Sequence, residues 1–276
     1  MAHRSIVTLT TDFGISDHFV GTIKGVILEI NPEAQIVDIS HSIQAFDVLD
    51  GALAIAQAYS YFPAGTVHMV VVDPGVGTAR RPIILSTDRH HFVAPDNGVL
   101  SLIYGREERV HVRHVTAEHY FLQPISKTFH GRDIFAPTAA YLSKGVDSEK
   151  FGEEITDFAR FNAPKPKPVD PQTLRGVVLK ADRFGNLITN ITSQDAPALF
   201  ADNPQGFTIK IGKQEITEIK NSYAEGAPGK LFAIINSMGY LEIAANRAPA
   251  AQLVGSAKGT EVNVVLQGAA AASNGN

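Results

Sequence analysis

Short apolar runs alternate with helical spacing in the first half of the chain. Apolar residues recur every three or four positions from Val20 to Ile30, which predicts a helix there, and Asp17 is placed to cap its first turn. Further helices are predicted over residues 47–61 and 132–142. Runs rich in β-branched residues predict strands at residues 6–9, 36–39, 67–72, 82–85, 91–94 and 109–115. Strands that alternate with helices indicate an α/β domain with a central, mostly parallel sheet.

The pattern changes after about residue 160. Proline becomes frequent in Ala163-Pro164-Lys165-Pro166-Lys167-Pro168-Val169-Asp170-Pro171, and proline at this density cannot continue a helix or a central strand. Beyond it, alternating runs predict strands at residues 207–211, 231–235, 240–244 and 261–266, and the middle two flank Ser237-Met238-Gly239 as a hairpin would. We therefore expect an α/β domain over residues 1–162, a proline-rich linker over 163–173, an all-β small barrel or sandwich domain over 174–267 and a low-complexity tail over 268–276.

Composition and charge narrow the possible partners. The chain has 276 residues, 44% of them hydrophobic, which is enough to bury a core in one or two domains. Its net charge is -4, and Lys and Arg never run longer than a pair, so no nucleic-acid partner is expected. No apolar run approaches the ~18 residues of a membrane span, so we expect no membrane association and a cytoplasmic protein. The expected partner is a small molecule.

Several cofactor and metal sites are excluded by residue type or spacing. Cysteine is absent, which excludes disulfides, thiolate metal sites and a cysteine nucleophile. His90 and His91 would point to opposite faces of a strand and so make poor joint metal ligands. Gly75-Val76-Gly77 lacks the third glycine of a dinucleotide-binding fingerprint. We expect neither a metal nor a cofactor.

Two segments carry candidate catalytic chemistry. In Asp73-Pro74-Gly75-Val76-Gly77-Thr78-Ala79-Arg80, the proline and glycines favour a turn that sets Asp73 and Arg80 facing one small space. His130 precedes Gly131 at the start of a predicted helix, where an exposed imidazole is natural. An aspartate, an arginine and a histidine together can hold and polarise a water molecule. Each residue is also common in ordinary loops and helix starts, and this alternative stays open.

Candidate ligand contacts lie in both predicted domains. Asp12 ends the first strand, where open α/β sheets bind ligands, and a carboxylate suits a ribose diol. Asp182 and Asn186 flank a segment dense in hydrogen-bonding groups. All three residues also fit simple turns beside glycine. The same choice between a ligand contact and a structural role applies to the hairpin residues Ser237 and Glu242 and to the aromatic residues Phe46 and Tyr223.

Seven short motifs occur in order across both predicted domains. They are Thr10-Thr11-Asp12-Phe13-Gly14, His41-Ser42-Ile43 with Phe46-Asp47-Val48, the segment from Asp73 to Arg80, Ala94-Pro95-Asp96-Asn97-Gly98, Thr128-Phe129-His130-Gly131-Arg132-Asp133, Asp182-Arg183-Phe184-Gly185-Asn186, and Asn236-Ser237 followed by Gly239, Leu241 and Glu242. Together they resemble the S-adenosyl-L-methionine hydroxide adenosyltransferases, the hydrolytic relatives of the adenosyl-fluoride and adenosyl-chloride synthases. Because the resemblance spans most of the chain, it is more specific than any single motif.

The resemblance implies both fold and reaction. It implies an N-terminal α/β domain, a C-terminal β-barrel and a homotrimer whose sites lie between neighbouring subunits. It also implies hydrolysis of S-adenosyl-L-methionine to adenosine and L-methionine, by in-line attack of an activated water on the ribose 5′ carbon, without a metal or cofactor. Its residues fall here on Asp73, Arg80 and His130 for the catalytic triad, Asp12 for the ribose, Phe46 and Tyr223 for aromatic walls, and Asp182, Asn186, Ser237 and Glu242 for adenine and methionine. Met238 stands where the halogenating relatives have an arginine, so recognition of the methionine carboxylate must differ.

Two other functions stay open. A halide-dependent adenosyltransferase would make 5′-halo-adenosine from the same substrate, although halide sites favour small hydroxyl and apolar contacts over aspartate and arginine. A non-catalytic protein that binds adenosine or S-adenosyl-L-methionine would keep the binding residues and lose the water-handling ones. The full set of Asp73, Arg80 and His130 therefore favours hydrolysis.

Overall fold

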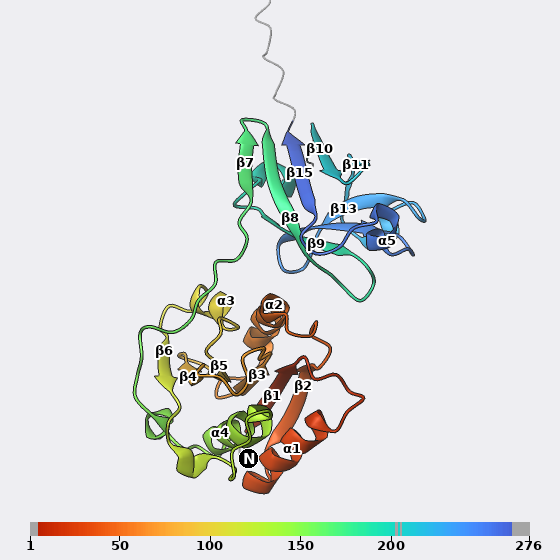
Figure 1. Cartoon of the computed structure of the whole chain (residues 1–276). Helices are drawn as coiled ribbons and strands as arrows, with labels where there is room; N and C mark the ends of the chain where they lie inside the picture. Colours follow the sequence, from red (N-terminus) through yellow and green to blue (C-terminus); the bar gives the residue numbers. More distant parts are fainter. Residues whose placement is uncertain (1–4, 202–203, 205, 267–276) are drawn as a thin grey trace, which may run out of the picture. The chain divides into compact units, whose positions relative to one another are not determined.

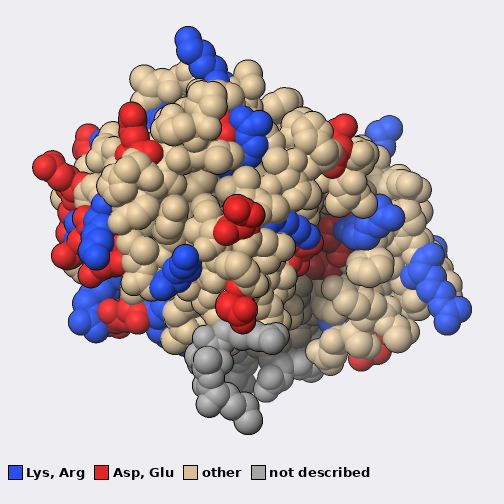
Figure 2. All heavy atoms as spheres, turned by 90° about the horizontal axis from the view of Figure 1, so that it is seen from below, with Lys and Arg blue, Asp and Glu red and all other residues tan. Residues whose placement is uncertain are grey.

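The computed structural model describes residues 5–201, 204 and 206–266 (Figure 1). The chain divides into two compact units, Met1–Ala163 and Pro164–Asn276. The expected tail over residues 268–276 lies outside the described residues. None of the helices in the described ranges has the length and hydropathy needed to cross a bilayer. Figure 2 shows acidic and basic side chains interspersed on the face seen from below.

The first unit is built on one sheet with the strand order β2-β1-β3-β5-β4-β6. The strands β2, β1, β3 and β5 run parallel, while β4 is antiparallel to β5 and β6. This confirms the predicted α/β class with a mostly parallel sheet. The strand bounds are β1 Ile6–Thr11, β2 Gln35–Ser40, β3 Val67–Val71, β4 Pro82–Ser86, β5 His91–Pro95 and β6 His111–His114.

Helices cover both faces of this sheet. The helices α1 (Phe19–Ile30) and α4 (Ala136–Ser143) share one apolar core with Met69 and Val71 of β3. Val70, which lies between Met69 and Val71 in the strand, belongs to a second apolar core together with residues of α2 and α3. Successive side chains of a strand point to opposite faces, so β3 is buried on both sides. The bounds of the second pair of helices are α2 Val48–Ala58 and α3 Ser101–Tyr104.

Helix starts differ in part from the predictions. Helix α2 begins as expected, because the Asp47 carboxylate accepts a hydrogen bond from the Asp50 amide at 3.1 Å. The predicted cap at Asp17 is wrong, since α1 begins after His18 and no side chain caps it. The helix predicted over residues 132–142 begins as a π-turn, η3 (Gly131–Phe135), that runs directly into α4. Such π-turns are frequent at functional sites, and this one follows His130.

The second unit is a curled, strand-rich sheet that also carries the small helix α5 (Ala250–Val254). Its strand order is β11-β10-β15-β8-β9-β14-β13-β12, and β7 pairs with β8. Strand β8 pairs with β15 through its first half and with β9 through its second, which bends the sheet around one apolar core. The bounds are β7 Lys167–Asp170, β8 Thr173–Ala181, β9 Leu187–Thr192, β10 Phe207–Ile211, β11 Gln214–Ile216, β12 Ile219–Lys220, β13 Leu231–Ile235, β14 Tyr240–Ala245 and β15 Glu261–Leu266. The predicted all-β class is confirmed.

The proline-rich segment contains a hydrogen-bonded strand, which a simple connector would not. Strand β7 lies inside the linker predicted over residues 163–173 and pairs antiparallel with β8, which itself begins at Thr173. That part of the linker prediction is wrong. Proline lacks an N–H donor, which excludes it from central strands but leaves edge strands such as β7 open to it.

Candidate active site

The loop that follows β3 carries two of the three candidate catalytic residues. We name residues 73–80 the Asp-Arg loop. It turns through hydrogen bonds from the Val76 amide to the Asp73 carbonyl oxygen and from the Thr78 amide to the Gly75 carbonyl oxygen, at 3.3 and 3.2 Å. Gly77 has a φ of 76°, and a Cβ there would lie 2.2 Å from the Lys127 carbonyl oxygen. Only glycine therefore lets this loop approach the segment that carries His130.

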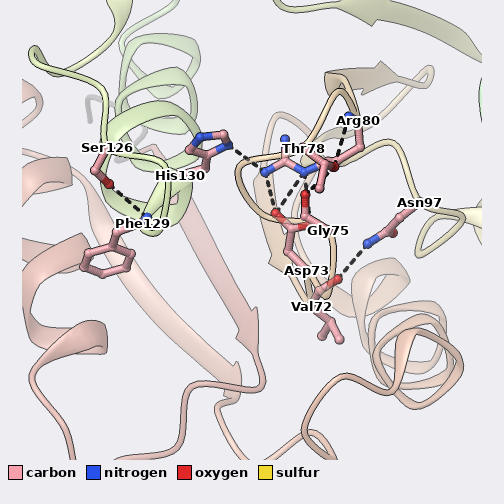
Figure 3. Close-up of polar contacts among 9 residues, drawn as sticks. All are labelled: Val72, Asp73, Gly75, Thr78, Arg80, Asn97, Ser126, Phe129 and His130. Atoms are coloured by element: carbon pink, nitrogen blue, oxygen red, sulfur yellow. Dashed lines mark hydrogen bonds and ion pairs between the residues drawn. The ribbon is translucent and has the colours of Figure 1, made fainter.

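The structure brings Asp73, Arg80 and His130 together (Figure 3). Arg80 donates through Nε to both Asp73 carboxylate oxygens, at 3.0 and 2.9 Å, and through Nη2 to Oδ2. The same Nη2 lies 2.9 Å from Nδ1 of His130. The Asp73 and Arg80 side chains are only 5% and 9% exposed. A buried, bidentate pair of this kind holds the guanidinium in one orientation.

The contact with Arg80 determines how the His130 ring is protonated. A guanidinium can only donate, so Nδ1 of His130 accepts, and the proton of the neutral imidazole is on Nε2. Burial lowers the pKa of His130 below its ordinary value, and the Arg80 charge lowers it further. His130 is therefore neutral at pH 7.

One nitrogen of the Arg80 guanidinium makes no hydrogen bond with the described part of the chain. Its central carbon lies 5.0 Å from the centre of the Phe135 ring, at the end of the π-turn. Nη1 is buried, and within the described part of the chain it has no hydrogen-bond partner. A buried, unpartnered donor of a positively charged group is suited to an oxygen nucleophile.

A cavity of about 270 Å³ adjoins these residues. Asp12 and Phe46 line it together with Asp73 and His130, so four of the sequence-predicted site residues surround one space. Asp12 accepts a hydrogen bond from the Phe46 amide at 2.8 Å. Phe46 is held at a φ of 65° and the residue is 74% exposed. A positive φ is uncommon for a bulky residue and is typical of functional sites.

Sequence reasoning missed an aromatic cluster on the same cavity. Phe13, Phe19 and Phe129 line it and meet edge to face, with ring centres 5.3 to 6.0 Å apart. Phe13 and Phe129 each lie beside a predicted site residue in the sequence, and that adjacency was the available signal. The three rings give the cavity an apolar surface in addition to its charged groups.

In the second unit, the segment around Asp182 is a structural turn that also lines a pocket. The Asp182 carboxylate accepts hydrogen bonds from the amides of Phe184 and Asn186, at 2.9 and 2.8 Å, and from Asn186 Nδ2 at 3.1 Å. This is the turn role that the sequence left open. Both residues nevertheless line an open pocket of about 790 Å³, together with Tyr223 and Arg247. The two roles are compatible, because a rigid turn presents fixed groups to a ligand.

Glu242 is buried, whereas Ser237 is exposed. Glu242 is 2% exposed and accepts hydrogen bonds from the Tyr223 hydroxyl at 2.9 Å and from Asn236 Nδ2 at 3.1 Å. Burial raises the pKa of Glu242, and burial with the Glu242 contact raises the pKa of Tyr223 to about 12. Glu242 therefore supports Tyr223, which lines the pocket. Ser237 is exposed in the turn between β13 and β14.

Within residues 5–201, 204 and 206–266, no cluster of three or more His, Asp or Glu side chains is arranged to hold a metal ion.

Comparisons with known proteins agree along the length of the chain. Residues 7–152 match the model of the SAM hydroxide adenosyltransferase N-terminal domain, and residues 176–263 match that of the C-terminal domain. The chain is 34% identical to a protein named (R)-S-adenosyl-L-methionine hydrolase from Salinispora tropica, over 96% of this chain and 99% of that protein. It is 28% identical to a protein named Fluorinase from an Actinoplanes species, over 89% and 92%.

A solved structure supports the same assignment. An uncharacterized conserved protein from Thermotoga maritima superposes with a TM-score of 0.86 at 36% identity, covering 94% of this chain and 99% of that one. The same family is therefore indicated by both domain models, by the identity to named relatives and by the fold. The chain belongs to the SAM hydroxide adenosyltransferase family.

Proposed function

We propose that this protein hydrolyses S-adenosyl-L-methionine to adenosine and L-methionine, and that Asp73, Arg80 and His130 act on the attacking water. The main support for this proposal is that the three side chains form a hydrogen-bonded cluster beside a cavity that Asp12 and Phe46 also line. The name of the Salinispora tropica relative specifies the R configuration at sulfur. We extend that preference to this chain.

The reaction needs an oxygen nucleophile more than it needs an acid. The water oxygen bonds to the ribose 5′ carbon, the bond from that carbon to sulfur breaks, and its electron pair stays on sulfur. The leaving group is a neutral thioether, so it requires no proton, and one proton from water is released. Water has a pKa of about 15.7, so the site must favour hydroxide character by charge and position.

The geometry assigns different parts of this task to the three side chains. Both Asp73 oxygens and Nδ1 of His130 already accept hydrogen bonds from Arg80, which fixes the guanidinium. The free Nη1 edge can then stabilise an oxygen that gains negative charge. A base contributes roughly 10²- to 10⁴-fold, while in-line positioning of water can contribute about 7–11 kcal/mol. Positioning is therefore the main contribution of this site.

The remaining predicted contacts belong to substrate binding in this proposal. Asp12 takes the ribose hydroxyls, and Phe46 provides an aromatic wall of the first cavity. Asp182, Asn186 and Tyr223, which line the pocket of the second unit, contact adenine or methionine. The set is completed by Ser237 and Glu242, the latter acting through its hydrogen bond to Tyr223.

We also propose a cytoplasmic homotrimer in which each site combines the first unit of one subunit with the second unit of its neighbour. The support is family membership and the predicted binding residues that line a pocket in each unit. Light scattering measures the oligomer. Asp73→Asn and Tyr223→Ala should each inactivate the protein when present in every subunit. If sites are shared between subunits, a mixture of the two variants should regain activity. Failure of the mixed trimer to regain activity contradicts shared sites.

The test of function is product analysis with the separated sulfur epimers, in the presence of a chelator. Adenosine and methionine should form in equal amounts, faster from the R epimer, and no cofactor or metal should be needed. His130→Ala should remove most turnover, whereas Arg109→Ala, a control at an exposed arginine, should leave it intact. Absence of adenosine above the level of the heat-inactivated protein contradicts the proposal.

The halide alternative has its own readout in the same assay. The similarity to a protein named Fluorinase is the reason to test it. Added chloride or fluoride should leave adenosine as the product. A halide-dependent peak of 5′-halo-adenosine would reverse the assignment.

A further inference from the structure

The turn formed by residues 94–98 holds both ends of the Asp-Arg loop. Val72 and Arg81 flank that loop, one on each side. Asn97 donates through Nδ2 to the Val72 carbonyl oxygen at 2.8 Å (Figure 3), and the Asp96 amide donates to the Arg81 carbonyl oxygen at 2.8 Å. Two consecutive residues of one turn therefore fix the separation between the start and the end of the loop.

This turn is itself firmly anchored. Asn97 Oδ1 accepts a hydrogen bond from the Val99 amide at 3.1 Å. The Asp96 carboxylate, 5% exposed, accepts from Arg81 Nε and Nη2 at 2.9 and 2.7 Å and from the Ala159 amide at 2.6 Å. The polar groups of both side chains are thus used within the first unit, and they act on the site only through the loop that they hold.

The loop needs this support because the catalytic contact crosses between two separate segments. Arg80 reaches His130 through the one contact of 2.9 Å between Nη2 and Nδ1, and these residues are 50 positions apart in the chain. The two backbone hydrogen bonds inside the loop are long, at 3.3 and 3.2 Å, and Thr78 Oγ1 adds a hydrogen bond to the Gly75 carbonyl oxygen at 2.7 Å, none of which reaches the segment that carries His130. A shift of the loop start at Val72 moves Asp73, and Arg80 follows it through their ion pair.

We propose that Asn97 is a positioning residue for the hydrolysis of S-adenosyl-L-methionine, acting through the Val72 carbonyl to place Asp73 and Arg80 against His130. This rests on the proposed function. The contribution is to turnover, since Asn97 lies outside the residues that line the cavity. Misplacement of a catalytic group by 1 Å can cost about 10²-fold in rate, so loss of one anchor should be visible in kcat.

The substitution Asn97→Ser isolates the anchor. Serine keeps an oxygen that can accept from the Val99 amide, but its short side chain cannot reach the Val72 carbonyl. We expect kcat to fall about tenfold or more while KM and the dissociation constant for adenosine change by less than about twofold. The pKa of His130, followed by NMR of the imidazole, should rise toward 6.5, because the Arg80 charge that helps to lower it has moved away.

The matched control is Ile27→Val on helix α1, a fully buried position that lowers stability without touching the Asp-Arg loop. If that variant loses a similar amount of thermal stability and keeps its kcat and its His130 pKa, a general loss of stability is excluded as the cause. Asn97→Asp is a second variant. It keeps the volume and the Val99 contact but sets a carboxylate oxygen against the Val72 carbonyl, so its kcat should fall further.

The outcomes separate this inference from the proposed function. A wild-type protein that releases no adenosine contradicts the function, and the NMR titration of His130 still tests the positioning role. A wild-type enzyme that turns over, with Asn97→Ser unchanged in kcat and in the pKa of His130, overturns the inference alone. Equal losses in kcat and in adenosine affinity also overturn it.

Discussion

Arg80 is the side chain on which the candidate site depends, because it makes the hydrogen bonds that join Asp73 and His130 into one cluster. It is held by the carboxylate of Asp73, by Nδ1 of His130 and by the face of the Phe135 ring. Few positions are left for the guanidinium, so its charge acts at one place. The effect of that charge on His130 is open to measurement.

Removal of the Arg80 charge should raise the pKa of His130. In Arg80→Gln we expect the pKa to move toward 6.5, since the Arg80 charge is one of the two causes that lower it and burial is the other. In the wild type, a protonated His130 loses its acceptor for Arg80, so kcat/KM should fall as the pH drops through a pKa below 6.5. NMR titration and a pH profile measure both quantities.

The control for this prediction is Arg81→Gln. Arg81 is the next residue, but it pairs with Asp96 and Asp157 and does not contact His130. The pKa of His130 should therefore stay at its wild-type value. An acid limb at or above pH 6.5 in the wild type would show that His130 is not the group that limits the rate.

Phe46 illustrates a residue whose backbone conformation opposes stability. Its φ of 65° costs a non-glycine residue roughly 1–2 kcal/mol. Phe46→Gly and Phe46→Ala both remove the ring, but only the glycine variant also relieves the backbone strain. We expect the glycine variant to be more stable than the alanine variant by about 1 kcal/mol in denaturant unfolding, with KM raised in both. Equal stabilities would show that the positive φ is not strained.

At the scale of elements, two loops and a π-turn assemble the site at the end of the parallel strands. Strand β3 delivers the Asp-Arg loop, and η3 follows His130 and ends at Phe135. These segments meet where Gly77 packs on the Lys127 carbonyl. Because the contact is between backbones, neither side can yield as a flexible side chain would.

Gly77→Ala should therefore separate the two loops. A Cβ 2.2 Å from the Lys127 oxygen cannot be accommodated, so we expect kcat to fall by roughly 10²-fold or more and stability to fall by more than the usual penalty for a positive φ. The measurements are steady-state kinetics and denaturant unfolding. Gly145→Ala is the matched control, since Gly145 has a φ of 88° and nothing within 4 Å of its Cβ position. A loss in Gly77→Ala no larger than in this control would argue against a close loop contact.

At the scale of the whole molecule, the core of the first unit contains two histidines that are neutral by necessity. His68 and His90 are 0% and 2% exposed, and their ring centres lie 5.1 Å apart. Burial lowers the pKa of both rings, that of His68 to about 3. His68 accepts or donates one hydrogen bond at Nδ1, with Thr8 Oγ1 at 2.7 Å. A charge on either ring would lie in an apolar core.

Acid should therefore unfold the first unit through these histidines. Their folded pKa values lie below the unfolded value of 6.5, so the unfolded state binds more protons below that pH. The stability that His68 contributes is complete above pH 6.5 and is lost as the pH falls toward 3, at up to roughly 1.4 kcal/mol per pH unit, and His90 contributes in the same direction below pH 6.5. Thermal unfolding between pH 7 and pH 4 measures the slope.

Substitution of one ring identifies the source of that slope. His68→Asn should reduce the pH dependence of stability, even though it lowers stability at pH 7. His119→Asn, at an exposed histidine, should leave the slope unchanged. An unchanged slope in His68→Asn would show that His68 is not a source of the acid sensitivity.

Local sequence was sufficient for the elements and for part of the site. Periodicity and turn residues depend on near neighbours in the chain, which is why the strands, the start of α2 near Asp47 and the hairpin of β13 and β14 were predictable. Asp73 and Arg80 are 7 positions apart in one loop, so their approach follows from turn chemistry. The start of α1 and strand β7 were not predictable in this way, since each depends on how its segment packs or pairs with the rest of its unit.

The sequence by itself determined the fold class, the family and the identities of the candidate catalytic residues. Tertiary structure alone decided their geometry. It set His130 against Arg80 across 50 residues, chose the ring nitrogen that accepts, left Nη1 of Arg80 free and tied the Asp-Arg loop to Asn97. The physical reason is range. Propensity and turn chemistry act over a few residues, whereas hydrogen bonds between distant segments exist only after the sheet and its two cores have formed.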